Sequence, residues 1–173
     1  DGGAGVEGKT VETRRDTGAL GWDNRVERVG GRDGRDEGKE TAWSRAGRGK
    51  GEDSVGGRGG DNRATITNSS AIGSVNGTDT VGGLVGNNDG NLTDSSASGS
   101  VTGNDSVGGL VGENEDNRRR TDPPGAIIRD ATASGSVTGN QNVGGVVGEN
   151  NGGTITDAET AGSVKGTGRN VGG

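Results

Sequence analysis

The sequence predicts an all-β fold, a parallel β-helix or solenoid built from coils of about 26 residues. Three observations predict it. A Val-Gly-Gly motif recurs at a nearly constant interval, short stretches alternate small apolar with polar residues, and glycine makes up 41 of the 173 residues. A fixed repeat distinguishes such a chain from glycine-rich sequence without order, because each repeat can bury its apolar side against its neighbours.

The repeat is marked by a valine followed by two glycines. It occurs at Val29, Val55, Val81, Val107, Val143 and Val171, at intervals of 26, 26, 26, 36 and 28 residues. The single long interval equals one period plus ten residues, and Glu115 to Pro124 is a polar, arginine-rich stretch of that length. Insertions in repeat proteins become loops on one face, so we expect an insertion loop at 115–124.

The sequence pattern predicts three short strands in each repeat. Alternation with a period of two marks the first at Ala97-Ser-Gly-Ser-Val101, and we expect a second around Val107 to Val111 and a third around Leu92 or Ile155. Gly-Gly and Asn-Gly stretches between them indicate turns. Glycine at this density opposes helix by about 1 kcal/mol per residue.

Stacked coils bring equivalent residues of successive repeats about 4.8 Å apart. We therefore predict two structural ladders, one of valines and one of asparagines. Their members are Val75, Val101, Val137 and Val164, and Asn62, Asn88, Asn114 and Asn150. Stacked side-chain amides can satisfy one another's hydrogen-bonding groups inside a protein. This explains why an asparagine recurs at the same position of each repeat.

Composition excludes several functions. The net charge of −6 and the presence of only two aromatic residues, both tryptophan, argue against nucleic-acid binding. No apolar run approaches the roughly 20 residues of a membrane span. The chain has no histidine and no cysteine, so we expect no catalytic residues, no cofactor and no thiolate zinc site. Its carboxylates are too sparse for a dedicated calcium site, which leaves only weak calcium binding.

The first third of the chain departs from the repeat pattern. Residues 1–45 are expected to be degenerate, rich in glycine, arginine and aspartate, and poorly ordered, whereas residues 46–173 carry the solenoid repeats. Arg32 and Arg58 stand where later repeats have Leu84 and Leu110, and an inward arginine would bury an unpaired charge. Degenerate coils, a charged cap and disorder are the alternatives for this segment.

Four Asn-x-Ser/Thr sequons make Asn68, Asn76, Asn91 and Asn104 candidate glycosylation sites. Chance matches are equally expected in a chain this rich in asparagine, serine and threonine.

Val81-Gly-Gly-Leu-Val-Gly and Val107-Gly-Gly-Leu-Val-Gly, each preceded by Gly-Ser-Val-x-Gly, resemble the GLUG repeat. The resemblance covers about residues 64 to 173. That repeat occurs in arrays within large secreted or surface-anchored prokaryotic proteins, including adhesin-like proteins and IgA-cleaving metallopeptidases. The resemblance implies a β-helical, non-catalytic stalk or adhesive region.

We therefore expect a structural or adhesive repeat region of a larger extracellular or cell-surface protein. Its first partners would be neighbouring repeats of the parent protein, and surface glycans or host-cell ligands are further candidates. Two alternatives are the repeat scaffold of a large secreted peptidase and a disordered, glycine-rich acidic linker.

Overall fold

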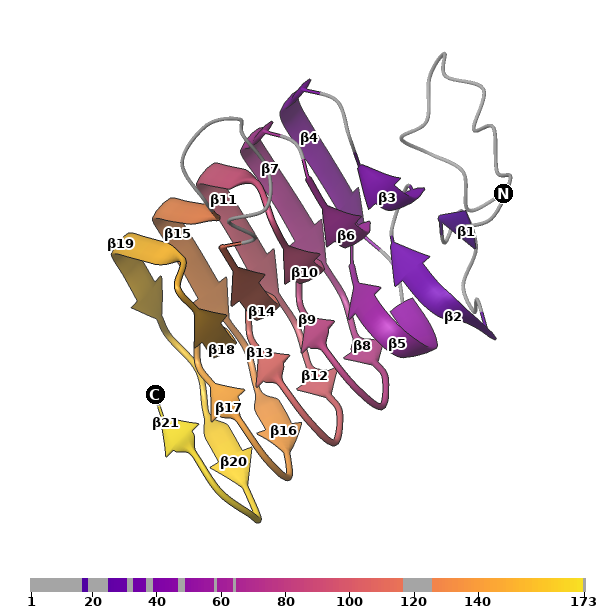
Figure 1. The fold of residues 1–173 in the computed structure, drawn as a ribbon, viewed down its shortest axis with the longest axis vertical. Coiled ribbons are helices and arrows are strands. Elements are labelled where there is room, and N and C mark those ends of the chain that lie inside the picture. The colour runs from indigo at the N-terminus through magenta and orange to yellow at the C-terminus, as the bar shows by residue number, and fades with distance from the viewer. Residues whose placement is uncertain are drawn as a thin grey trace.

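A computed structural model describes residues 17–18, 25–30, 33–36, 39–46, 49–57, 59–63, 65–116 and 126–172, with side chains from Ser54 onward. These residues form β-strands joined by turns, wound into a stack of coils (Figure 1). Within them there is no helix with the length and apolar character needed to cross a membrane. The predicted all-β parallel solenoid is confirmed, and for the described residues it replaces the alternative of a disordered linker.

One coil contains four strands rather than the predicted three. In the second complete coil these are β11 (Asn91–Ser98), β12 (Val101–Thr102), β13 (Val107–Gly108) and β14 (Val111–Glu115). The alternating stretch after Ala97 does not form a single strand, because it bends at Gly99, where φ is +130°. The stretch from Val107 to Val111 is likewise divided by a bend at Gly109 and Leu110.

The same four strands recur in the neighbouring coils. The preceding coil has β7 (Thr65–Ile72), β8 (Val75–Asn76), β9 (Val81–Gly82) and β10 (Val85–Asn88). The following coil has β15 (Ile127–Ser134), β16 (Val137–Gly139), β17 (Val143–Gly144) and β18 (Val147–Asn151). In the last coil the structure describes three strands, β19 (Thr154–Thr160), β20 (Val164–Gly166) and β21 (Val171–Gly172), which pair with β15, β16 and β17. Equivalent strands pair in parallel, so the coils form four in-register stacks.

The first strands of the chain continue this stack. They are β1 (Thr17–Gly18), β2 (Arg25–Gly30), β3 (Asp33–Asp36), β4 (Lys39–Ala46), β5 (Gly49–Gly56) and β6 (Gly59–Asn62). β4 pairs with β7, β5 with β8 and β9, and β6 with β10. β1 lies between β2 and β3 and pairs with both. Most of residues 1–24 and both Arg32 and Arg58 lie outside the described residues, so the expected disorder of 1–45 stays a prediction.

The first two residues of the expected insertion at 115–124 still pair with the next coil. Glu115 is the last residue of β14 and pairs with Asn151, and the backbone N–H of Asp116 donates to the carbonyl oxygen of Asn151 at 3.0 Å. Pairing resumes at Ile127, whose N–H donates to the carbonyl oxygen of Gly90. The extra ten residues therefore fall between the end of β14 and the start of β15, and 117–125 lie outside the described residues.

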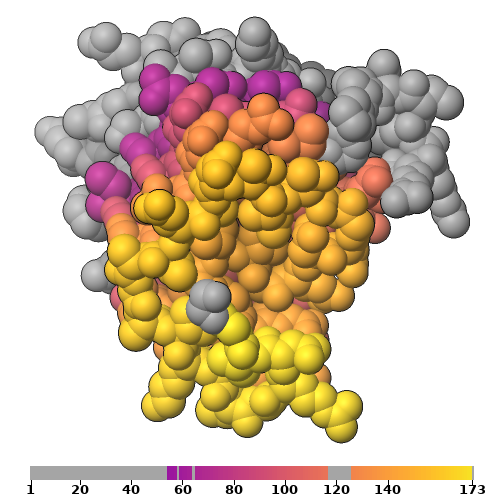
Figure 2. All heavy atoms as spheres, turned by 90° about the vertical axis from the view of Figure 1, so that its left-hand side faces the viewer, coloured from indigo at the N-terminus to yellow at the C-terminus, as the bar shows by residue number. Residues whose placement is uncertain are grey.

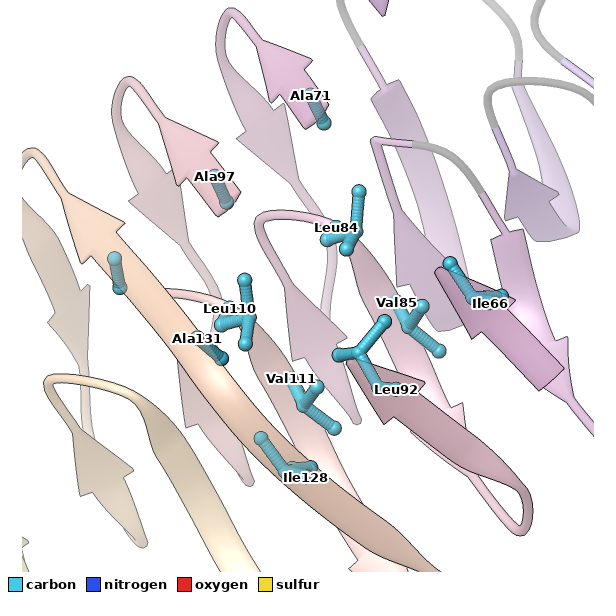
Figure 3. Close-up of a cluster of buried hydrophobic side chains, with 11 residues drawn as sticks. Ile66, Ala71, Leu84, Val85, Leu92, Ala97, Leu110, Val111, Ile128 and Ala131 are labelled. Carbon is cyan, nitrogen blue, oxygen red and sulfur yellow. The ribbon is translucent and has the colours of Figure 1, made fainter. Parts of the chain in front are cut away.

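Two apolar cores run along the stack. The first lies between the long strands and the β10 and β14 stack, and Figure 3 shows its side chains meeting in rows. Its largest fully buried members are Ile66, Leu84, Leu92, Leu110 and Ile128. The second contains only valines, namely Val55, Val75, Val81, Val101, Val107, Val137 and Val143. Each coil thus contributes an isoleucine or leucine to one core and valines to the other.

A polar residue with positive φ bends each of the long strands β7, β11, β15 and β19. Asp94 has φ +49°, and the equivalent residues Asn68, Asp130 and Asp157 have φ between +49° and +50°. Asparagine and aspartate adopt this left-handed conformation more readily than other residues that carry a Cβ. In β11, Leu92 and Ser95 are both buried, three residues apart, whereas a regular strand would separate two inward residues by two. The bend therefore keeps both halves of the strand facing the interior.

Candidate functional site

The main polar feature inside the solenoid is a continuous column of asparagine side chains, here called the asparagine ladder. The structure places Asn62, Asn88, Asn114 and Asn150 in register on neighbouring strands. Asn62 Nδ2 donates to Asn88 Oδ1 at 2.6 Å, Asn88 Nδ2 to Asn114 Oδ1 at 2.8 Å, and Asn114 Nδ2 to Asn150 Oδ1 at 2.8 Å. Every bond of the ladder points in the same direction along the stack.

The ladder also holds the turn of each coil. Asn88 Nδ2 makes a second hydrogen bond to the carbonyl oxygen of Gly90, and Asn150 Nδ2 donates to that of Gly153. Asn88 and Asn114 have 0% of their surface exposed, and Asn62 has 1%. A buried amide without partners would be costly, so these bonds offset the loss of water. The ladder is therefore a structural site that fixes the register of successive coils.

The predicted valine ladder lies in the second core. Val75, Val101, Val137 and Val164 pair consecutively in the β8, β12, β16 and β20 stack. The first three are at most 3% exposed, and Val164, in the last coil, is partly buried. A shorter polar stack joins Ser69 and Ser95, where the Ser69 N–H donates to Ser95 Oγ at 3.3 Å.

The strands of the asparagine ladder carry a second row of polar residues, mostly carboxylates. Asn87, Glu113 and Glu149 stack in register, and Glu115 follows two residues after Glu113 on β14. Because successive residues of a strand point to opposite faces, these side chains lie opposite the asparagine ladder. We call Asn87, Asp89, Glu113, Glu115 and Glu149 the acidic face. Asp89 has a cationic neighbour, Arg63, whose Nε lies 3.5 Å from Asp89 Oδ2.

Hydrogen bonds from the same coil and from neighbouring coils hold the carboxylates of the acidic face. Glu149 Oε2 accepts from Ser106 Oγ at 2.8 Å and from Asn142 Nδ2 at 3.1 Å. Glu113 Oε1 accepts from Asn151 Nδ2 at 2.6 Å. In the described part of the chain, no three carboxylates are grouped so that they could hold a metal ion. The acidic face is thus held by charge-assisted hydrogen bonds, two between coils and one within a coil.

The pKa of Glu113 is raised above its ordinary value of 4.5. Burial is the largest cause, and the negative charges of Glu149, Glu115 and Asp89 add to it, while the hydrogen bond from Asn151 acts in the opposite direction. The folded state consequently holds this proton more tightly than the unfolded chain does.

This shift predicts how stability depends on pH. The contribution of Glu113 is fully present below pH 4.5, the ordinary value, and is lost as the pH rises through the raised pKa of the folded state. We expect Glu113→Gln to flatten the pH dependence of the urea midpoint between acidic and neutral pH, and to raise the midpoint at neutral pH. Glu159→Gln, at an exposed position on β19, is the matched control. An unchanged pH slope in Glu113→Gln would contradict the assignment.

The four sequon asparagines lie on or near the surface. Asn68, Asn76 and Asn104 are exposed, and Asn91 is half-buried at the start of β11. Ser106, the third residue of the last sequon, is buried and bonded to Glu149. Glycosylation at these sites stays a prediction.

Sequence reasoning did not find the acidic face. Asn87, Glu113 and Glu149 each follow the last glycine of the repeated Gly-Leu-Val-Gly or Gly-Val-Val-Gly segment, so alignment of the repeats alone would have placed them in one column. The contact of Glu149 with Ser106 joins two coils that are 43 residues apart in the sequence, and its contact with Asn142 joins two sides of one coil. The repeat spacing indicates neither contact.

The model of one family, the GLUG motif, matches residues 77–102 and 103–138. No curated protein matches the chain, and no solved structure matches it. The first matched segment contains β9, β10, β11 and β12, and the second contains β13, β14, β15 and the first two residues of β16. Residues 77–138 are therefore two consecutive GLUG motif repeats, each forming one complete turn of the β-solenoid.

Proposed function

We propose that this chain is a non-catalytic spacer, a stalk or display scaffold within a larger extracellular or cell-surface protein. The observation that carries the proposal is the continuity of its interior, where two cores and the asparagine ladder pass from coil to coil without interruption. In such a stack each repeat contacts only its neighbours, and added repeats extend the structure along one axis. The GLUG repeats at 77–138, a type found in arrays, support the same role.

The outer positions of the long strands support display. From β7 to β19 one inward position of the long strand is always apolar, occupied by Ile66, Leu92, Ile128 and Ile155. Next to them, the outward residues of the same register are Thr67, Thr93, Arg129 and Thr156. Arg129 replaces threonine in one of these four coils while the inward residue stays apolar, so an outward residue can change without a change of the fold.

A duplication tests the spacer function. Inserting a second copy of 77–102, one complete repeat, directly after Thr102 keeps every later side chain in phase. We expect a cooperatively folded protein that is longer by about 4.8 Å along its axis. Small-angle X-ray scattering measures the maximum dimension, and urea denaturation measures the stability.

The matched control inserts only 77–89, half of the repeat. This places later inward residues out of register, and we expect loss of cooperative unfolding because core positions then receive polar side chains. If both insertions are tolerated equally, the chain behaves as a flexible linker and the spacer function is wrong.

Adhesion is the second part of the proposal, and it needs its own measurement. An adhesive region would bind immobilised cell-surface glycans or whole cells through its exposed face, and substitution of Thr67, Thr93 and Thr156 by lysine would abolish that binding. Binding that persists in this triple variant would exclude the long-strand face as the adhesive surface.

A further inference from the structure

One oxygen atom of the acidic face lacks a hydrogen-bond donor. Asn87 Oδ1 is shielded from solvent, and no group among the described residues donates to it. A buried acceptor in this state costs stability, so it needs an explanation. The first candidates for a donor are the side chains in register with Asn87 on the neighbouring strands.

Glu113 is the register partner of Asn87 on the next coil. The two residues lie on β10 and β14, which pair in parallel, and partners on such strands are about 4.8 Å apart. Their side chains leave the sheet on the same side, so the carboxyl of Glu113 lies beside the amide of Asn87. A charged carboxylate can only accept hydrogen bonds, whereas a neutral carboxyl has one O–H donor.

The other contacts of Glu113 leave one of its oxygens for this donor. Asn151 Nδ2 donates to Oε1, so a proton can occupy Oε2. On the β18 side, the register partner Glu149 already accepts from Ser106 and Asn142 with its Oε2. The acceptor that still lacks a donor lies on the β10 side.

The charged groups that face Glu113 in the described chain favour its neutral form. Glu115 lies on the same strand, Asp89 follows β10 and Glu149 lies on β18, and the negative charges of all three act on Glu113. The cation beside them, Arg63, is paired with Asp89. Burial and these charges together raise the pKa of Glu113.

The pair of Asn87 and Glu113 lies inside the stack. β10 is paired with β6 and β14, and β14 is paired with β10 and β18. Figure 2 views the stack from its last coil, and the magenta and pink atoms of the earlier coils lie behind the orange and yellow atoms of the later ones. The contact therefore does not depend on the outermost strands of the described chain.

We propose that Glu113 takes up a proton from solvent at acidic pH and that its O–H then donates a hydrogen bond to Asn87 Oδ1. The contact between two successive coils tightens on acidification and loosens as the pH rises. The acidic face thus contains a proton-sensitive lock, which the spacer function alone does not require.

The pKa of Glu113 in the full chain, measured by NMR titration of its side-chain carboxyl, tests this proposal. Asn87→Ala removes the acceptor of the neutral form, so the proton affinity of Glu113 should fall about threefold or more. Asn151→Ala is the same truncation on the other side, but it removes a donor to the charged form, so the proton affinity should rise. Asn76→Ala, at an exposed position of β8, should leave it unchanged.

Opposite shifts in the first two variants distinguish this contact from a general effect of truncation, because entry of water would lower the proton affinity in both. An equal fall in both, or an unchanged value in Asn87→Ala, would overturn the proposal. The urea midpoint gives a second readout in the same proteins. Its gain on acidification should be smaller in Asn87→Ala than in the unmodified chain, and equal gains would contradict the lock.

Discussion

Asn114→Asp is expected to destabilise the solenoid by about 3 kcal/mol or more. Asn114 is 0% exposed, accepts a hydrogen bond from Asn88 Nδ2 and donates one to Asn150 Oδ1. The aspartate has nearly the same shape, but it replaces the donor with an oxygen that faces the Oδ1 of Asn150. The carboxyl must then stay charged without water or take up a proton, and both alternatives cost stability. Urea denaturation at neutral pH measures the loss.

Asn150→Asp makes the same chemical change at an exposed position of the same ladder. Its carboxylate can still accept from Asn114 Nδ2, and only the bond to the carbonyl oxygen of Gly153 is lost. We expect a loss of about 1 kcal/mol or less. Equal losses in the two variants would mean that burial of the ladder does not determine its contribution.

Gly108→Ala is expected to cost about 3 kcal/mol or more. A Cβ at Gly108 would meet the carbonyl oxygen of Val111 and would lie 2.7 Å from the backbone nitrogen of Gly148. Both contacts are with backbone atoms, so no side chain can move away to relieve them. The methyl group would force β13 away from β14 and from the next coil.

Gly172→Ala is the matched control, because Gly108, Gly144 and Gly172 share one register. A Cβ at Gly172 would have no neighbouring atom within 4 Å. Its thermal midpoint should therefore stay close to that of the unmodified chain. If Gly108→Ala is also tolerated, the close approach of the two strands does not constrain the coil.

The repeat made the architecture predictable. Identical residues recur at equal spacing along the chain. When the coils stack, these residues come into register on neighbouring parallel strands, so the repeat interval alone predicts the pairing. Asn88 and Asn114 illustrate this, since their spacing of 26 residues equals one turn, and their side chains are hydrogen-bonded. The same reasoning indicated which positions face the interior without any knowledge of the turns.

The shape of each coil was not predictable in the same way. A bend such as that at Asp94 depends on a backbone conformation, and aspartate is also common in ordinary exposed turns. The bend shifts the alternation of inward and outward residues by one position. For this reason Ser95 is buried although it is polar. The two short strands on either side of Gly109 were read as one for a similar reason, since Val107 and Val111 fit a single alternating strand.

The uniform direction of the asparagine ladder gives the solenoid an electrical polarity. Each side-chain amide has its oxygen toward the preceding coil and its N–H groups toward the following one, so the amide dipoles add along the axis. The column is partially positive at Asn150. Hydrogen bonds arranged in such a chain polarise and strengthen one another, so a longer stack should hold each of its amides more firmly than a short one does.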